Sequence, residues 1–305
     1  MKYIIICGPT CSGKTGLGID LALRYKGEII SADSRQIYKH TTIGTAKPKP
    51  EKCRGVKHHL INFLELDENF SAYKFAEVAR KLIKTIINKH KLPLVVGGTG
   101  LYLKALTEGL FESPEPDTAY RQELRKKSDR YGPEILHEML EEVDPEAANR
   151  ITAQDEIRLI RALETYELTG KPITEMHAEG EHIRFGSPLW VGLMPERKIL
   201  YNSINKRVDD MIDEGLEQEV LQLEPYLDIL RKKKMVGYTD LISYLFDKKL
   251  SRDEAIEKVK QHHRNYAKRQ ITWFKKVKQI NWFDPNSENY KNEIDRICDK
   301  FLEIA

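Results

Sequence analysis

The stretch that decides the fold is Tyr3-Ile4-Ile5-Ile6-Cys7-Gly8-Pro9-Thr10-Cys11-Ser12-Gly13-Lys14-Thr15. Its apolar first part predicts a strand buried on both faces, because such strands lack the polar alternation of half-exposed ones. Its second part, residues 8–15, fits the pattern G-x-x-x-x-G-K-[ST], in which the backbone N–H groups of a glycine-rich loop surround phosphate oxygens. Leu17, Leu21 and Ala22 then follow at helical spacing. A strand, a phosphate loop and a helix in this order predict a phosphate-binding α/β core.

Strand and helix patterns continue to alternate on both sides of this stretch. Apolar runs at residues 28–32 and 92–96 predict two more strands, and residues 73–88 have the apolar stripe of an amphipathic helix. Strand character returns at residues 189–194 and again at 280–283. Alternation of this kind predicts a parallel sheet with helices on its faces, as in the P-loop NTPase-like class of α/β proteins.

A long segment in the middle of the chain has only helical patterns, from about residue 117 to residue 178. A proline-containing stretch at residues 113–116 predicts a linker before it. We therefore expect residues 1–114 to form the first part of the core, residues 115–184 an inserted all-helical domain, and residues 185–305 the second part of the core. Ser251 and Glu254 form a capping box that predicts a helix running to about residue 278.

Composition narrows the class of protein. The chain has 305 residues, of which 40% are hydrophobic and 32% charged, and these values fit an ordinary globular protein. Its longest apolar runs are too short to span a bilayer, and the first strand begins too early to leave room for a signal peptide. Four cysteines without a C-x-x-C pair indicate reduced thiols, so we expect a cytoplasmic protein with no membrane contact.

The net charge of +3 is small, but the basic residues are clustered. Residues 258–278 contain eight lysines or arginines and no acidic residue, and residues 231–234 form a second basic run. Such clusters can neutralise backbone phosphates of a nucleic acid, although a solvated helix face gives the same pattern.

The phosphate loop itself leaves its ligand open. Lys14 supplies a full charge and the Thr15 hydroxyl can bind Mg²⁺, so ATP is the default ligand. ATPases usually hold Mg²⁺ with an aspartate that ends another apolar strand, whereas the strand at 92–96 ends in Gly97-Gly98-Thr99. The carboxylate in such a place is Asp33, which follows the strand at 28–32. Asp33 can bind Mg²⁺, accept a proton or cap a turn.

Six short motifs, taken together and in order, resemble one known family, the tRNA dimethylallyltransferases. They are the phosphate loop and the stretches at residues 31–38, 43–48, 58–60, 97–102 and 267–273. The resemblance covers nearly the full length. It implies a P-loop α/β core, a helical insertion that holds the anticodon stem of a tRNA, and Mg²⁺. The family transfers the dimethylallyl group of dimethylallyl diphosphate to N6 of an adenosine beside the anticodon.

The resemblance also implies a role for individual residues. Residues 8–15 and Arg207 would hold the diphosphate, with Thr15 beside Mg²⁺. Asp33 would take the proton of the adenine amine, and Thr99 would orient that amine. The tRNA contacts would come from Asp33, Ser34, Arg35, Gln36, Thr99, Arg121, Gln154, Asp155, Glu156, Ile157, Arg158, Lys233, Lys234, Met235, Val236, Gly237 and Tyr238. Many members carry a basic residue after the Gly-Tyr pair, where this chain has Thr239. A monomer without an obligate protein partner is expected.

Other interpretations compete at several positions. A small-molecule P-loop kinase also needs the phosphate loop, but it does not account for the helical insertion and the basic run together. His58 and His59 are expected to pack or form hydrogen bonds, because adjacent histidines rarely bind one metal ion and no Cys/His cluster accompanies them. Trp273 and Phe274 are expected in the core. Glu164 and Glu167 are expected to be surface charges.

Overall fold

The computed structural model describes residues 1–110, 114–179 and 184–303. The chain divides into two compact units. The core unit comprises Met1–Thr107 and Phe185–Ala305, and the helical unit comprises Glu108–Arg184. The domain boundaries inferred from the sequence stay predictions, because residues 111–113 and 180–183 beside them, and with them Ser113 of the expected linker, lie outside the described residues.

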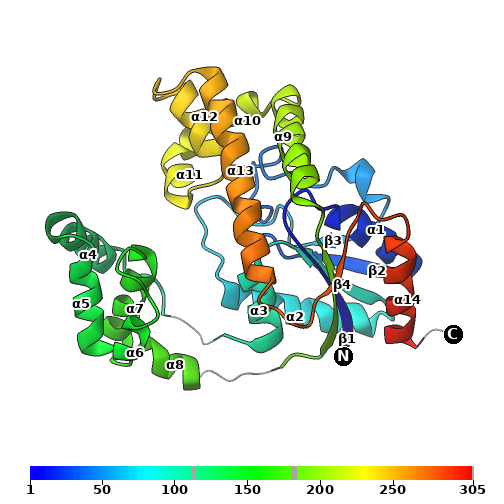
Figure 1. The fold of residues 1–305 in the computed structure, drawn as a ribbon, viewed down its shortest axis with the longest axis horizontal. Coiled ribbons are helices and arrows are strands. Elements are labelled where there is room, and N and C mark those ends of the chain that lie inside the picture. Colours follow the sequence, from blue (N-terminus) through cyan, green and yellow to red (C-terminus); the bar gives the residue numbers. More distant parts are fainter. Residues whose placement is uncertain (111–113, 180–183, 304–305) are drawn as a thin grey trace. The chain divides into compact units, whose positions relative to one another are not determined.

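The core unit is built on a sheet of six parallel strands, in the order β3-β2-β4-β1-β5-β6. The strands are β1 Lys2–Cys7, β2 Gly27–Ser31, β3 His58–His59, β4 Leu92–Gly97, β5 Ser187–Leu193 and β6 Asn281–Phe283. Figure 1 shows β1 among its neighbours in the sheet. Because β1 pairs with β4 and β5, the loop that follows it lies between the carboxyl ends of two neighbouring strands, where ligands bind in open α/β sheets.

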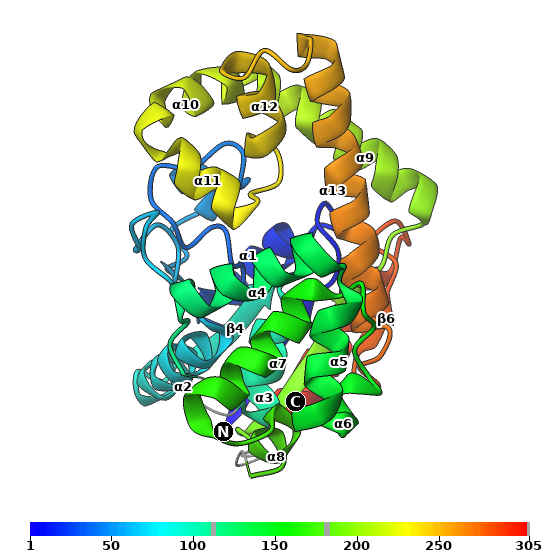
Figure 2. The same cartoon turned by 90° about the vertical axis from the view of Figure 1, so that its left-hand side faces the viewer.

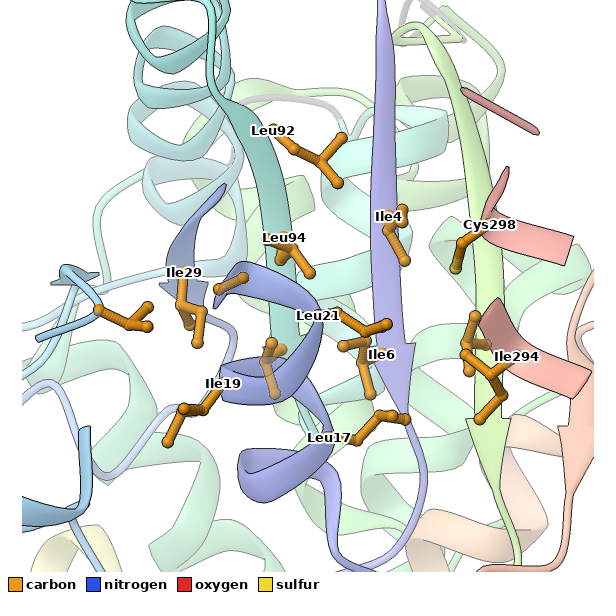
Figure 3. Close-up of a cluster of buried hydrophobic side chains, with 14 of the residues drawn as sticks. Ile4, Ile6, Leu17, Ile19, Leu21, Ile29, Leu92, Leu94, Ile294 and Cys298 are labelled. Carbon is orange, nitrogen blue, oxygen red and sulfur yellow. The ribbon is translucent and has the colours of Figure 1, made fainter. Parts of the chain in front are cut away.

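Helices follow the strands as the alternation predicts. Those of the core unit are α1 Lys14–Arg24, α2 Ala72–Asn88, α3 Gly100–Glu108, α9 Arg197–Asp213, α10 Leu216–Gln222, α11 Leu227–Lys233, α12 Tyr238–Leu245, α13 Arg252–Phe274 and α14 Tyr290–Leu302, with short 3₁₀ turns at Pro50–Cys53 and Glu224–Tyr226. Figure 3 shows Leu17 and Leu21 of α1 packed over Ile6 of β1 and Leu94 of β4. Ile294 and Cys298 of α14 are buried in the same cluster. This apolar layer fixes α1, and therefore the phosphate loop that precedes it.

The helical unit has its own apolar core. It contains α4 Thr118–Tyr131, α5 Glu134–Val143, α6 Pro145–Ala148, α7 Glu156–Thr169 and α8 Ile173–Glu179. Leu124, Leu140 and Leu159 bring α4, α5 and α7 together (Figure 2). The core unit ends at Thr107 before this insertion and resumes at Phe185, whose backbone N–H donates to the Thr107 carbonyl at 3.1 Å.

The prediction that Glu164 is a surface charge was wrong. Its side chain is fully buried, and it accepts hydrogen bonds from Arg121 and Arg161 and from the backbone N–H of Asp117. Burial raises the pKa of this carboxyl, but the bonds from Arg121 and Arg161 outweigh burial and hold it below its ordinary value. A glutamate among apolar helix positions gives no sign in the sequence of the two arginines that compensate it. Glu167 is exposed, as predicted.

The long helix α13 begins at the predicted capping box, where Ser251 and Glu254 exchange hydrogen bonds. It packs against α9 and α12 (Figure 2). It ends at Phe274 rather than near residue 278, because the chain must turn there to enter β6. Phe274 is buried as expected, whereas the neighbouring Trp273 is 36% exposed. Among the described residues, no helix is both long enough and apolar enough to cross a membrane.

Candidate active site

The phosphate loop has a backbone that only particular residues allow. Gly8 adopts a φ of 139°, and a Cβ there would lie 2.4 Å from the Leu193 carbonyl oxygen of β5. Gly13 lies in the left-handed region with φ 90°, directly before α1. Both glycines are therefore required to bring the loop against the sheet and to start α1 with its N–H groups toward the cavity.

Lys14 is half-buried beneath this loop. Its Nζ donates to the Pro9 carbonyl at 2.5 Å, so the ammonium group is held by the loop it belongs to. Burial, reinforced by the nearby positive charge of Arg207, lowers the pKa of Lys14 to about 8. A bound diphosphate would relieve both effects, because it supplies the opposite charge.

Asp33 follows β2 and lines the cavity beside the phosphate loop. Its Oδ1 accepts hydrogen bonds from the backbone N–H of Arg35 at 2.8 Å and of Gln36 at 3.3 Å. The turn-capping role and the functional role that the sequence left open are thus compatible. One oxygen fixes the turn, and we find no protein donor to Oδ2 among the described residues.

Thr99 lies at the end of the neighbouring strand. Its backbone N–H donates to the Ala32 carbonyl, and its Oγ1 accepts from the backbone N–H of Ser34 at 3.1 Å. Gly97 makes this close approach possible, since a Cβ there would lie 2.1 Å from the Ala32 oxygen. The ends of β2 and β4 are therefore tied together, and Asp33 and Thr99 are held side by side.

Two residues of α13 complete the site, and sequence reasoning assigned a role to neither. The Gln270 Oε1 accepts from the backbone N–H of Thr10 at 2.8 Å, and its Nε2 donates to the Gly98 carbonyl at 2.9 Å. This side chain links the phosphate loop to the end of β4. Tyr266, one turn earlier, contacts the side chain of Thr99. Both residues lie in or beside a quoted motif, but no spacing rule indicates that α13 crosses the sheet at this point.

Two adjoining cavities open over these residues. The first, of about 220 Å³, contains Lys14, Thr15 and the rest of the loop, and we call it the phosphate chamber. The second, of about 180 Å³, contains Arg35, Met235 and His263, and we call it the outer chamber. Asp33, Arg207 and Tyr266 line both chambers. A ligand in the phosphate chamber and a ligand in the outer chamber would therefore meet at Asp33.

Arg207 of α9 is placed as the resemblance implies for a diphosphate contact. Its Nη1 donates to the Thr10 Oγ1 at 3.3 Å, and the side chain borders the phosphate chamber. Lys14 and Thr15 of the phosphate loop and Arg207 of α9 thus face one cavity. A phosphorylated ligand fits this set of donors.

The expected tRNA contacts of the core unit divide into two groups. Ser34, Arg35, Lys234, Met235 and Val236 line the outer chamber. Asp33 lines it as well, whereas three other expected contacts have side chains that are engaged within the protein. Gln36 donates to the Thr45 and Ala46 carbonyls, Lys233 donates to the Tyr38 hydroxyl and the Glu68 carbonyl, and Tyr238 is fully buried.

The loop at residues 42–44, which forms part of the wall of the outer chamber, is anchored by one carboxylate. Glu219 of α10 accepts hydrogen bonds from the backbone N–H groups of Thr42, Ile43 and Gly44 and from the Tyr238 hydroxyl. A Cβ at Gly44 would lie 2.6 Å from the Tyr238 ring, so glycine is needed for this contact. The buried Tyr238 therefore supports the wall of the outer chamber.

The remaining expected tRNA contacts belong to the helical unit. Gln154, Asp155, Glu156, Ile157 and Arg158 surround the start of α7, where Asp155 is the N-cap. Ile157 is 72% exposed, and Arg158 is exposed beside Asp155. Arg121 is held by Glu164 through two hydrogen bonds, so its guanidinium also has a structural role.

The two adjacent histidines form hydrogen bonds, as predicted. The His58 Nδ1 is 2.9 Å from the Val56 carbonyl oxygen, and the His59 Nε2 is 2.7 Å from the Glu28 carboxylate. Within the described part of the chain, no group of three or more His, Cys, Asp or Glu side chains could hold a metal ion. The four cysteines are unpaired thiols.

These features define a P-loop α/β protein whose phosphate chamber opens, past a carboxylate, into a second polar cavity. A family model described as IPP transferase matches residues 36–277. The chain therefore belongs to the IPP transferase family.

Relatives and solved structures agree with this family. The chain is 47% identical to a tRNA dimethylallyltransferase of Geobacillus thermodenitrificans, over 93% of this chain and 90% of the relative. A full-length tRNA isopentenylpyrophosphate transferase from Bacillus halodurans is 37% identical, with a TM-score of 0.70 and coverage of 99% and 97%. A structure of a eukaryotic dimethylallyltransferase acting on tRNA is 28% identical, with a TM-score of 0.83 and coverage of 99% of this chain and 79% of that one.

Proposed function

We propose that this protein transfers the dimethylallyl group of dimethylallyl diphosphate to N6 of the adenosine 3′-adjacent to the anticodon of tRNA and releases diphosphate. The observation that carries the proposal is the place of Asp33, on the shared wall of the phosphate chamber and the outer chamber. A prenyl donor held by the phosphate loop would present its reacting carbon to a nucleoside in the outer chamber. The names of the relatives support this choice of donor and acceptor.

The diphosphate is the leaving group in this reaction. Backbone N–H groups of the loop, Lys14 and Arg207 would stabilise the negative charge that develops as the bond between C1 and oxygen breaks. The loop is fixed by Gln270 and by the packing of α1, which supports a binding site that needs little rearrangement. The reaction needs no water molecule to attack a γ-phosphoryl group. This agrees with the end of β4, where glycines and a threonine stand in place of the aspartate that holds Mg²⁺ in ATPases.

The adenine amine is a poor nucleophile, because its lone pair is delocalised into the ring. Asp33 would accept the amine proton during attack through Oδ2, while Oδ1 keeps its two backbone hydrogen bonds. Thr99, held next to Asp33, would orient the amine. The adenosine must leave its stack to reach the outer chamber, as in other enzymes that modify a base.

Mg²⁺ fits the residues that face the phosphate chamber. The Thr15 hydroxyl would supply an oxygen ligand there, and Mg²⁺ typically takes only one or two protein ligands and completes its shell with phosphate oxygens and water. When bound, the ion would neutralise charge on the diphosphate. Lys14 and Arg207 hold the same group from the protein side.

The helical unit would bind the anticodon stem. Its exposed Arg158 and the basic residues of α13 can neutralise phosphates, which position a nucleic acid without selecting its sequence. The proposed substrate implies a reaction in the cytoplasm. A monomer, as expected from the sequence, stays a prediction.

A transfer assay without nucleotide tests the proposal. Purified protein, Mg²⁺, unmodified tRNA and dimethylallyl diphosphate are incubated, and the digested tRNA is analysed by mass spectrometry. One dimethylallyl group on an anticodon-loop adenosine is the expected product. Absence of this product, together with ATP hydrolysis or phosphoryl transfer to a small molecule, would replace the proposal with the kinase interpretation.

A further inference from the structure

One histidine of the outer chamber has no part in the reaction described above. His263 lies on the face of α13 that also carries Tyr266 and Gln270, at helical spacing. Tyr266 and Gln270 both serve the active site, through Thr99 and the phosphate loop. The helix therefore directs His263 toward the same cavity, whose wall it forms together with Arg207 and Met235.

The ring of His263 is incompletely satisfied by the protein. Its Nε2 is buried and has no hydrogen-bond partner in the described part of the chain. The backbone of Gly237 lies close to this nitrogen, since a Cβ built there would be 3.6 Å from it, but it supplies no hydrogen bond to the ring. Buried polar atoms in native proteins nearly always have a partner, and an atom of a residue in a cavity wall can take that partner from a ligand.

The charge state of His263 limits the kind of ligand. Burial, with the positive charge of Arg207 and the neighbouring His262, lowers the pKa of His263 to about 4. The other charged groups lining the chamber are Arg35, Lys234, Arg269 and Asp33. At neutral pH the ring is therefore an uncharged donor and acceptor among several cations. It suits a neutral polar group, while the arginines and lysine suit phosphates.

We propose that His263 is a substrate-binding residue that hydrogen-bonds the nucleoside of the target adenosine, at a ring nitrogen or a ribose hydroxyl. The inference rests on the proposed function, because it takes the adenosine as the occupant of the outer chamber. The contact would hold the extruded nucleoside while its amine faces Asp33. His263 would thus affect the RNA substrate and leave the diphosphate substrate alone.

A substitution series tests this role. His263→Leu removes both nitrogens at similar size, and His263→Gln keeps one amide group near the position of Nε2. The control is His262→Asn on the same helix, since His262 is 47% exposed and an amide can keep its hydrogen bond to Asp240. Steady-state transfer is measured with an anticodon stem-loop RNA and dimethylallyl diphosphate, each varied in turn.

We expect His263→Leu to lower kcat/KM for the RNA about 3- to 10-fold, the range for one neutral hydrogen bond, with KM for dimethylallyl diphosphate within twofold of wild type. His263→Gln should recover most of the loss, and His262→Asn should match wild type. RNA parameters within twofold of wild type for His263→Leu would overturn the inference. Equal losses for both substrates would do the same, because they indicate a structural role.

Modified RNAs give a second, independent readout. Stem-loops carrying 7-deazaadenosine, 3-deazaadenosine, 1-deazaadenosine or 2′-deoxyadenosine at the target each lack one acceptor or hydroxyl. The analogue that lacks the contacted atom should impair the wild-type protein but cause no further loss with His263→Leu. Additive losses for every analogue would exclude the contact. Failure of the wild type to modify any RNA would instead count against the proposed function.

Discussion

At the scale of residues, Asp33 combines two tasks that the sequence presented as alternatives. Its Oδ1 holds the turn after β2 through Arg35 and Gln36, and its Oδ2 is left for a ligand. An alanine substitution would remove both functions at once. Asparagine separates them, because its carbonyl oxygen can still accept the backbone hydrogen bonds while the side chain cannot take a proton.

We therefore expect Asp33→Asn to lower kcat about 10²- to 10⁴-fold, the usual effect of losing a general base. The melting temperature and the affinity for tRNA should stay close to those of wild type. Single-turnover transfer and thermal unfolding measure the two effects. Near-normal turnover by Asp33→Asn would remove this carboxylate from the mechanism.

The lowered pKa of Lys14 predicts a pH dependence of diphosphate binding. With a pKa of about 8 in the free protein, Lys14 is charged below that pH and neutral above it. The affinity for dimethylallyl diphosphate should thus be greatest below pH 8 and fall by up to about tenfold per pH unit above it. Calorimetric titration from pH 7 to about pH 9.5 measures this slope.

The control for this prediction is Lys14→Arg, because a guanidinium does not titrate in this range. Its affinity should be weaker but nearly independent of pH. The same slope in both proteins would assign the pH dependence to another group. The stability of the unliganded protein depends on pH in the opposite direction. The lysine keeps its proton up to about pH 10.4 in the unfolded chain, so the free energy of unfolding rises between pH 8 and that value.

Much of the site could be predicted at this scale because it is local in the sequence. The phosphate loop, Asp33 and Thr99 each follow a strand directly, so the parallel sheet brings them to one edge. Gln270, Tyr266 and His263 could not be assigned, because their roles depend on where α13 crosses that edge. Glu219 was missed for a similar reason, since its partners are backbone groups of a loop distant in the sequence.

At the scale of elements, the predicted strands and the predicted long helices agree with the structure to within a few residues, whereas β3 was not predicted. Periodicity failed where a polar residue occupies an apolar position. Glu164 of α7 is the clearest case. Its partner Arg121 lies on α4 and reaches it only when α4 packs on α7. Its second partner, Arg161, also donates to the Pro114 carbonyl. An isolated glutamate in a helix pattern looks the same whether it is exposed or paired and buried.

Replacing Glu164 with alanine should destabilise the helical unit by about 3–5 kcal/mol, the cost of breaking a buried charge pair. Arg121 and Arg161 would lose their shared acceptor. Because the pKa of Glu164 is held below its ordinary value, its contribution is present above about pH 4.3 and is lost as the pH falls through the lower folded-state value. Urea unfolding at pH 7 followed by far-UV circular dichroism measures the change. Glu167→Ala, on the exposed face of the same helix, is the matched control and should change little.

At the scale of the whole molecule, the proposed function assigns the chemistry to the core unit and part of the tRNA binding to exposed basic side chains of the helical unit. We expect Arg158→Ala to raise KM for tRNA about 3- to 10-fold and to reduce the salt slope of binding by about 1, because one phosphate contact is lost. Arg150→Ala is the control, since Arg150 is similarly exposed on the helical unit and also pairs with a nearby carboxylate, but is not among the expected tRNA contacts. A change confined to dimethylallyl diphosphate kinetics would show that Arg158 is wrongly assigned.

The hydrogen bond between Thr107 and Phe185 also bears on how the nascent chain folds. β5 cannot pair with β1 until the ribosome has released residues 108–184. Until then, one edge of β1 has no partner strand in the sheet. An unstructured loop of that length costs about 2–3 kcal/mol more to close than a short turn. If the helices of the helical unit fold first, less of this chain is still unstructured when β5 pairs, and the closure cost is smaller.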